Sequence, residues 1–566
     1  MKRLLLALLL GLLVLGSSCN RIFAASTQFL PTEPKSGIGL KVSQCFDDTP
    51  RSGYAPVLIT ISNDTTAAHS WDFHFQSPGR NYGNNGNAVT FDRTLSVPPQ
   101  TERNFDVLVP LALIASNQYN NSSISIVTTG RGAISTPVFL TGRNDSQNAR
   151  ISLGYSTAIE KRAGSDLRAK FDATHATFHT AIDFTRVPSD WRAFSGLDLL
   201  WITDEEWNAL LPETRIAVEQ WVATGGILYR TSREGISGEV LEKRGFGEIR
   251  RFAELGGAPA ANAISAVTNQ EPSGISKQLS EEYRNAWPDP KIIPPYVPNS
   301  VLLISIIVVF GILVGPFNFF VLGKREKRHR IFWTTPALSI GGALLVGGTI
   351  LVQDGFNGWG KRVALIHLLP EQNSEVILQE QASRTALMTK SDFSTDATAL
   401  VEPISLDMRP HQFSTDGENY GGDWFASRRI QGQWLATVRP SRARVQITNS
   451  AEFAAGQPPK ILSSIAVNLD DFFWISSDSR VWHTANLGPG KTVALTPVNA
   501  MELYSKINRT FQSLAGTRLR MLQKRVAQKP NFFYATARAP QNVLLPSLSV
   551  IQWRDDHVLY MGATLP

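Results

Sequence analysis

The chain has 566 residues, of which 43% are hydrophobic and 18% are charged, and its formal net charge is +7. This length suits three or four domains, and the ordinary apolar fraction indicates that most of the mass is folded outside a membrane. The positive excess is modest and lies largely in the N-terminus and one central loop, so it does not predict a nucleic-acid partner.

The N-terminus has the pattern of a secretory signal. Met1-Lys2-Arg3 is basic, and the apolar run that follows, Leu4 to Leu15, is short for a membrane span. We expect residues 1–25 to be a signal peptide, cleaved near Ser18 or after Ala24 or Ala25. Two alternatives stay open. One is lipid attachment at Cys19, although Gly16 stands where a lipoprotein signal needs a Leu-like residue; the other is an uncleaved anchor.

Residues 26–145 predict an exported β-sandwich. Short β-branched runs such as 56–63 and 124–127 alternate with polar turns such as 84–87, which is typical of a sandwich. Cys19 and Cys45 are the chain's two cysteines. With the signal removed, Cys45 would stand alone, so no internal disulfide is expected despite an oxidising compartment.

Residues 146–283 change to alternating strands and helices. Leu197 to Thr203 predicts an apolar strand, 212–223 a helix that begins with proline, and 227–231 a return strand after Gly225-Gly226. This order predicts a parallel, flavodoxin-like α/β sheet. Residues 284–298 are rich in proline and predict a stiff linker that spaces this domain from the membrane.

Two apolar segments in the centre predict a transmembrane hairpin. Residues 299–322 and 332–353 are each long enough to cross the ~30 Å hydrocarbon layer as a helix. The loop between them, residues 323–331, carries five Lys or Arg side chains against Glu326. Short basic loops stay in the cytoplasm, so both large flanks are expected outside it, on the periplasmic side of the inner membrane. Pro316 predicts a kink, and Asn318 predicts an interhelical hydrogen bond.

Residues 354–566 again predict a β-rich exported region. Strands are expected at 362–368, 444–449, 464–469, 550–553 and 557–561. A single helix is expected from Met501 to Ala527, with the basic residues Arg518, Arg520, Lys524 and Arg525 mostly on solvated faces.

Two motifs carry a resemblance to a known group. The strand 197–203, the helix ending in 220–226 and the strand 227–229 are similar to the class I glutamine-amidotransferase-like fold. The segment 314–322, the basic loop and 332–338 resemble a group of uncharacterised bacterial membrane proteins with a Gly-Pro-x-Asn hairpin. That resemblance implies an exported β domain, an amidotransferase-like domain, and an association with MoxR-type AAA ATPases and von Willebrand A proteins.

The residues argue against amidotransferase chemistry. That reaction needs a cysteine nucleophile backed by histidine and glutamate, yet no cysteine follows Cys45. Dipeptides such as Ser195-Gly196 and Ser237-Gly238 do not form a Gly-x-Ser-x-Gly elbow. Acyl transfer therefore lacks a starting nucleophile. We predict no catalytic residues, no cofactor and no resident metal.

Asp204 and Glu205 are the candidate ligand-binding residues, because they end a predicted central strand where open α/β sheets bind ligands. They could hold a divalent cation. The alternative, which we favour, is an acidic first turn of a helix stabilised by the helix dipole. His175 and His179 have zinc-like spacing but lie on an expected strand, and His69 and His74 are expected to pack across strands.

The sequence thus predicts a non-catalytic, membrane-anchored envelope protein whose exported domains bind or scaffold partner proteins. A ligand sensor that uses the α/β domain and signals through the hairpin is the leading alternative. A metal-dependent hydrolase using Asp204 or Glu205 ranks below both.

Overall fold

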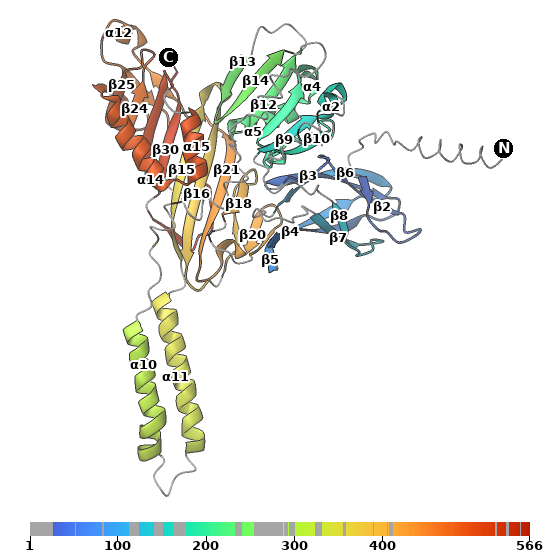
Figure 1. Ribbon diagram of the computed structural model, residues 1–566, viewed down its shortest axis with the longest axis vertical. Helices are drawn as coiled ribbons and strands as arrows, with labels where there is room; N and C mark the ends of the chain where they lie inside the picture. The colour runs from blue at the N-terminus through green and yellow to red at the C-terminus, as the bar shows by residue number, and fades with distance from the viewer. Residues whose placement is uncertain are drawn as a thin grey trace, which may run out of the picture.

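The computed structural model describes residues 27–50, 52–81, 84–111, 124–140, 151–163, 167, 171, 177–232, 240–253, 287, 293, 300–322, 331–354, 358–388, 390–404, 406, 411–526, 529–538, 543–554 and 556–565. These residues form a sheet-rich, multidomain body from which two helices project (Figure 1). The predicted signal peptide, the basic loop, most of the proline-rich segment and His175 lie outside the described residues.

The N-terminal part is a β-sandwich, as predicted. One sheet has the order β1-β2-β3-β6, with β1 (Thr27–Phe29), β2 (Ile38–Gln44), β3 (Tyr54–Asn63) and β6 (Thr101–Pro110). The facing sheet contains β4 (His69–Asn81), β5 (Asn84–Val97), β7 (Ile124–Gly130) and β8 (Val138–Leu140). Strand alternation turns Val57, Ile59 and Ile61 inward against Trp71 and Phe73 of the other sheet, which gives a shared apolar core.

The second sheet of the sandwich is extended by strands that follow the hairpin. Its order is β17-β20-β19-β5-β4-β7-β8, and the added strands are β17 (Phe393–Ser394), β19 (Gln412–Thr415) and β20 (Asn419–Gly422). β19 pairs in parallel with β5, from Gln412 opposite Ala88 to Thr415 opposite Phe91. We call this junction the seam. It joins the region before the hairpin to the region after it within one sheet.

The middle part is an α/β unit. Its sheet order is β10-β9-β11-β12-β14-β13, and all neighbouring pairs are parallel except β13 with β14. The strands are β9 (Ile151–Ser156), β10 (Thr177–Ile182), β11 (Leu199–Thr203), β12 (Ile227–Ser232), β13 (Val240–Arg244) and β14 (Gly247–Ala253). In chain order the parallel strands lie 2-1-3-4-5, the arrangement of flavodoxin-like sheets that the sequence predicted.

The helices of this unit are α2 (Thr157–Ala163), the 3-10 turn η1 (Trp191–Phe194), α4 (Asp204–Ala209) and α5 (Pro212–Ala223). The bounds of α5 match the predicted helix residue for residue, because a proline opens it and Gly225, at φ +126°, follows its end. Trp221 of α5 packs into the largest apolar core, which this unit shares with the C-terminal region.

The C-terminal region is built on a ten-stranded sheet, β18-β21-β16-β15-β30-β28-β24-β25-β27, with β29 also pairing with β15. Its strands are β15 (Gly358–Leu369), β16 (Ser374–Thr385), β18 (Leu400–Ile404), β21 (Ile430–Pro440), β24 (Leu469–Ile475), β25 (Val481–Leu487), β27 (Thr496–Val498), β28 (Phe532–Ala537), β29 (Ile551–Trp553) and β30 (His557–Ala563). A small sheet contains β22 (Val445–Ile447), β23 (Lys460–Ser463) and β26 (Thr492–Ala494), and short helical turns are η4 (Pro370–Gln372), η5 (Asp423–Phe425) and α12 (Ser450–Ala454).

The prediction of a single helix from Met501 to Ala527, with solvated basic residues, is wrong in two respects. The segment is divided into α13 (Ala500–Leu503), the π-helical η6 (Tyr504–Arg509), α14 (Thr510–Leu514) and α15 (Thr517–Val526). Arg518, expected on a solvated face, is buried: its Nη1 lies 2.9 Å from Glu402 Oε2, and its guanidinium lies 4.0 Å from the centre of the Trp434 ring. A buried arginine needs such a partner, which a chain pattern does not reveal.

The hairpin consists of α10 (Ser300–Ile312), which continues as the π-helical η2 (Leu313–Leu322), and α11 (Ile331–Asp354). Ser300–Val321 and Ile331–Thr349 are long and apolar enough to be membrane spans. The turn around Pro316 is π-helical. Asn318 forms the expected interhelical bonds: its Nδ2 donates to Thr335 Oγ1 at 2.8 Å, and Thr334 Oγ1 donates to its Oδ1 at 2.6 Å.

The described residues of the proline-rich segment do not act as a spacer alone. Trp287 and Ile293 are buried in the largest core. A Cβ atom on Gly432 of β21 would lie 2.6 Å from the Trp287 ring, so the indole covers that glycine closely. The chain is therefore anchored to the C-terminal sheet shortly before it enters α10.

Candidate functional site

Asp204 and Glu205 lie where the sequence placed them, at the carboxyl end of β11. Thr203 caps α4 through a reciprocal capping box with Glu206, so the three carboxylates form an acidic first turn. Asp204 Oδ1 lies 2.5 Å from Arg230 Nη2, and Glu205 Oε2 lies 3.5 Å from Arg162 Nη2. Both carboxylates are therefore engaged in ion pairs. Among the described residues, no group of three His, Cys, Asp or Glu side chains is arranged to hold a metal ion.

The histidines lie in ordinary packing environments. His179 of β10 packs against Tyr155 and Phe171, with ring centres 6.1 and 5.5 Å away. His74 pairs with Asp92 across β4 and β5, and His69 lies edge-on to a tryptophan ring.

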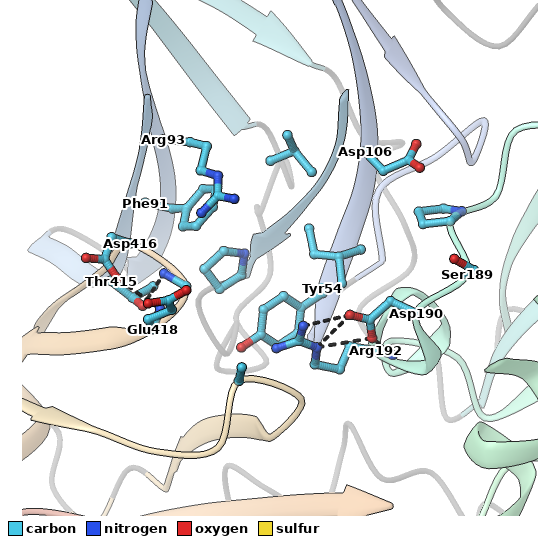
Figure 2. Close-up of a pocket in the computed structure, with 16 residues that line it drawn as sticks. Tyr54, Phe91, Arg93, Asp106, Ser189, Asp190, Arg192, Thr415, Asp416 and Glu418 are labelled. Atoms are coloured by element: carbon cyan, nitrogen blue, oxygen red, sulfur yellow. Dashed lines mark hydrogen bonds and ion pairs between the residues drawn. The ribbon is translucent and has the colours of Figure 1, made fainter. Parts of the chain in front are cut away.

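A cleft at the seam brings together three parts of the chain that are distant in sequence (Figure 2). Its volume is about 410 Å³, within the range of small-molecule and peptide sites. We call it the seam cleft. The lining residues come from three regions. The N-terminal sandwich contributes Tyr54, Phe91, Arg93, Asp106, Val107, Leu108 and Pro110, and the α/β unit contributes Pro188, Ser189, Asp190 and Arg192. The region after the hairpin contributes Ala397, which lies between β17 and β18, and Thr415, Asp416, Gly417 and Glu418 at the β19–β20 turn.

The turn η1 fixes one wall of the seam cleft. Asp190 caps this turn by accepting a hydrogen bond from the Arg192 backbone N–H at 2.9 Å. The same carboxylate binds the Arg192 guanidinium, with Nη2 2.6 Å from Oδ2 and Nε 3.1 Å from each oxygen. Burial alone would lower the pKa of Arg192, but the hydrogen bond and charge of Asp190 raise it above its usual value. Arg192 is therefore a fixed cation in this wall.

This wall also binds the segment directly before β18. Arg192 Nη1 donates to the Ala399 carbonyl at 3.3 Å, and Trp191 Nε1 donates to the Thr398 carbonyl at 3.3 Å. The guanidinium lies 5.8 Å from the Tyr54 ring centre, and burial raises the pKa of Tyr54, whose hydroxyl hydrogen-bonds to Tyr420. Three parts of the chain thus meet through direct polar contacts beneath the seam cleft.

The opposite wall is acidic. Asp416 accepts hydrogen bonds from the backbone N–H groups of Glu418 and Asn419 at 2.9 and 2.7 Å and from the Asn419 amide at 2.9 Å. Although partial burial works in the other direction, these bonds lower the pKa of Asp416 and keep it ionised. Asp106 projects from β6, and burial raises its pKa.

A second cavity of about 490 Å³ continues from the seam cleft on the other side of β19 and β20. It shares Thr415 and Asp416 with the seam cleft and adds polar groups that include Asp92, Lys390 and Asp392. Polar cavities thus lie on both sides of the seam.

An edge strand also lines the seam cleft. β6 is the last strand of its sheet among the described residues, and Asp106 to Leu108 line the cleft. An edge strand presents unpaired backbone N–H and C=O groups, to which an extended peptide can add as a further strand. The lining is rich in charged and polar groups, which suit binding of a polar, extended ligand.

Sequence reasoning did not find this cleft. Thr90 and Phe413, which meet at the seam, are 323 residues apart, and nothing in either segment marks the other as its partner. The only local signal was the Asp416-Gly417-Glu418 turn between short strands, which resembles any polar turn.

Comparisons with known proteins do not identify a family. No protein-family model matches the chain, and no curated protein matches it. Solved structures give weak likenesses. One is a calcium-binding mutant of β-glucuronidase 2 from Bacteroides uniformis, which is 10% identical over 34% of this chain and 23% of that one, with a TM-score of 0.14. Another contains the CBM22-1 and GH10 modules of xylanase 10B from Clostridium thermocellum, which is 9% identical over 37% of this chain and 43% of that one, with a TM-score of 0.14. The chain thus spans less than half of either structure, and neither likeness carries an argument about fold or activity.

Proposed function

We propose that this protein is a non-catalytic, membrane-anchored envelope protein whose exported body binds a partner protein in the seam cleft. The observation that carries this proposal is the polar cleft built from three distant parts of the chain, with the edge strand β6 in its lining. An extended segment of the partner would add to β6 through backbone hydrogen bonds, and its side chains would meet Arg93 on one side and Asp416 and Glu418 on another.

The fixed charges of the cleft favour a polar partner segment with both signs of charge. Arg192 is neutralised by Asp190, whereas Asp416 is held ionised by amide donors that carry no full charge. A basic side chain of the partner would therefore find its complement at the β19–β20 turn.

We further propose that α10, η2 and α11 cross the inner membrane with residues 323–331 in the cytoplasm and the body outside. The charge of that loop supports this orientation. Phe332 and Trp333, exposed by 84% and 82% directly after the loop, suit the aromatic belt at a membrane surface. Residues 1–25 would be the export signal.

The α/β unit would be a descendant of the amidotransferase-like fold that keeps the sheet order without the nucleophile. The resemblance of the hairpin also suggests that the partner belongs to a MoxR-type ATPase system; the ATPase, being cytoplasmic, would act through a membrane intermediary.

Site-specific photocrosslinking in intact cells tests partner binding. A photoreactive p-benzoylphenylalanine replaces Asp106 or Glu418 in the cleft, and Lys524 on the exposed face of α15 serves as the control. We expect a discrete protein adduct from the two cleft positions and none from the control. If neither cleft position yields an adduct in cells, and the melting temperature of the purified chain depends on a small ligand, the sensor hypothesis would replace the scaffold proposal.

Cysteine labelling tests the orientation. In a Cys45→Ser background, Lys327→Cys in the loop should react with a membrane-impermeant maleimide only after the membrane is broken. Lys491→Cys in the body should react in intact spheroplasts. The reverse pattern would overturn the proposed compartment.

A further inference from the structure

The two ends of the hairpin are tied to the body by short lengths of chain. Asp354, the last residue of α11, is four positions from Gly358, the first residue of β15, so the chain between them spans at most about 14 Å. On the other side, the buried Ile293 is seven positions from Ser300, which allows at most about 25 Å. Two short tethers restrict both the height of the body above the membrane and its tilt.

Strand register shows which part of the body these tethers hold at the membrane. Gly358 at the start of β15 lies opposite Thr385 at the end of β16, and Arg384 lies opposite Ile430 at the start of β21. Gly358 also pairs with Ile551 of β29. All of these positions belong to one end of the ten-stranded sheet, and Figure 1 shows the hairpin projecting from that end.

This end, which we call the basal edge, carries arginine and tryptophan side chains: Trp359, Arg384, Arg428, Trp553 and Arg554. The two tryptophans are half-buried and pack partly against the apolar cores. The Arg554 backbone N–H donates to the Gly360 carbonyl at 2.8 Å, which fixes its position beside β15. Its guanidinium lies 5.5 Å from the centre of the Trp359 ring and is exposed. Arg428 is exposed and donates its backbone N–H to Ala386, directly after β16.

Among the described residues of the basal edge, arginines outnumber acidic side chains. Of the nearby acidic residues that the structure describes, Asp556 is held by Arg362 at 2.5 Å, and that guanidinium lies over the Trp553 ring. Asp354 ends α11. Arg428 and Arg554 are the exposed arginines of this edge. Arginine recognises phosphate through its planar fork of donors, and tryptophan favours the headgroup level of a bilayer.

We propose that the basal edge rests on the outer leaflet and binds the phosphate groups of anionic phospholipids. The tether lengths place this edge within reach of the headgroups, and its arginine and tryptophan content suits them. The contact would hold the ten-stranded sheet upright, so that the seam cleft faces the envelope rather than the bilayer. This inference depends on the hairpin crossing the membrane and is independent of any partner in the cleft.

Hydrogen exchange on the full chain in lipid nanodiscs tests the proposal. Exchange is compared in neutral phosphatidylcholine and in phosphatidylcholine with phosphatidylglycerol. We expect amides of residues 358–362 and 551–554 to exchange more slowly with the anionic lipid, by about fivefold for each basic side chain that contacts an anionic surface. The variant Arg428→Gln/Arg554→Gln should lose this lipid-dependent slowing.

The matched control is Lys491→Gln/Lys524→Gln, which removes the same charge from exposed positions away from the hairpin and should keep the slowing. Both arginines are exposed, so the fold should survive, and the comparison of lipids on the unaltered chain tests the proposal without any variant. Equal exchange rates in the two lipids would overturn the proposal. This includes strong protection in both lipids, which would mean that something other than anionic lipid covers the basal edge. Equal loss in the control would also overturn it, because the effect would then follow net charge alone.

Discussion

His367 should make the stability of the body depend on pH. It lies in β15 with 4% of its surface exposed, between the rings of Phe246 in the α/β unit and Phe532 in β28, whose centres are 5.1 and 5.6 Å away. Burial, with a smaller contribution from the charge of Lys529, lowers the pKa of His367 from 6.5 to about 3. The folded protein therefore keeps this imidazole neutral, and the charged group Lys529, which acts on it, is itself a cation.

The direction in which stability changes with pH follows from proton binding. Below pH 6.5 the unfolded chain gains a proton on His367, whereas the folded chain stays unprotonated until about pH 3. The contribution of His367 to stability is thus fully present above pH 6.5 and is lost as the pH falls from 6.5 towards 3. Proton linkage with these two pKa values gives a loss of about 2 kcal/mol between pH 7 and pH 5, and about 4 kcal/mol by pH 3.

Urea unfolding of the purified chain, followed by tryptophan fluorescence at pH 7 and pH 5, measures this loss. Wild type should lose about 2 kcal/mol more over this interval than His367→Phe or His367→Leu, because neither variant can take up the proton. Other titrating groups affect all three chains alike and cancel in the difference. His557→Gln, at an exposed histidine, should follow the wild type. Parallel pH profiles for wild type and both His367 variants would refute the reasoning.

Two further predictions concern buried polar contacts. Arg518→Met should destabilise the body by about 3–5 kcal/mol, because Glu402 would stay buried without its cation, and Arg518→Met/Glu402→Gln should recover much of that loss in urea unfolding. A double variant no more stable than Arg518→Met would show that the packing of Arg518 on Trp434 matters more than the charge pair. In the hairpin, Asn318→Leu should lower stability by about 1 kcal/mol, since two interhelical hydrogen bonds disappear. Thr349→Val, whose hydroxyl donates only within its own helix, is the control; equal thermal shifts in nanodiscs for both variants would contradict a role for the interhelical bonds.

Local patterns predicted much of the secondary structure. The bounds of α5 followed from a proline at its start and Gly225 past its end, and the strand–helix alternation predicted the parallel pairing of the α/β sheet. Both features depend on residues close together in sequence. Asp204 and Glu205 also lie where expected, but their partners Arg230 and Arg162 come from other elements and could not be assigned from the chain.

The features that sequence reasoning missed depend on distant residues. The basic residues of α15 indicated a helix with solvated faces. However, Arg518 is buried, where it forms an ion pair with Glu402 of β18 and stacks on the Trp434 ring of β21. The proline-rich segment indicated a spacer, yet Trp287 fills the space above Gly432. In both cases the burial of a side chain is decided by a partner that no local period identifies.

The seam constrains the membrane topology on physical grounds. β5 precedes the hairpin and β19 follows it, and their backbones pair in one sheet. A second contact repeats this relation, since Arg525 Nη1 donates to the Gly225 carbonyl at 2.9 Å. Backbone pairing of this kind cannot form across a bilayer, so the two flanks must share a compartment, and the chain between them must cross an even number of times.

Deletion of the second span therefore gives a sharp prediction. If the hairpin crosses the membrane as proposed, removing residues 332–353 would send the C-terminal region to the opposite side of the membrane from β5. The seam could not form, and we expect the N-terminal sandwich to become sensitive to protease in spheroplasts. Replacing the same residues by an unrelated apolar helix of equal length should restore protection, because the seam requires an even number of crossings and not this particular sequence. A deletion variant that stays as resistant as wild type would show that the sandwich folds without the strands from beyond the hairpin.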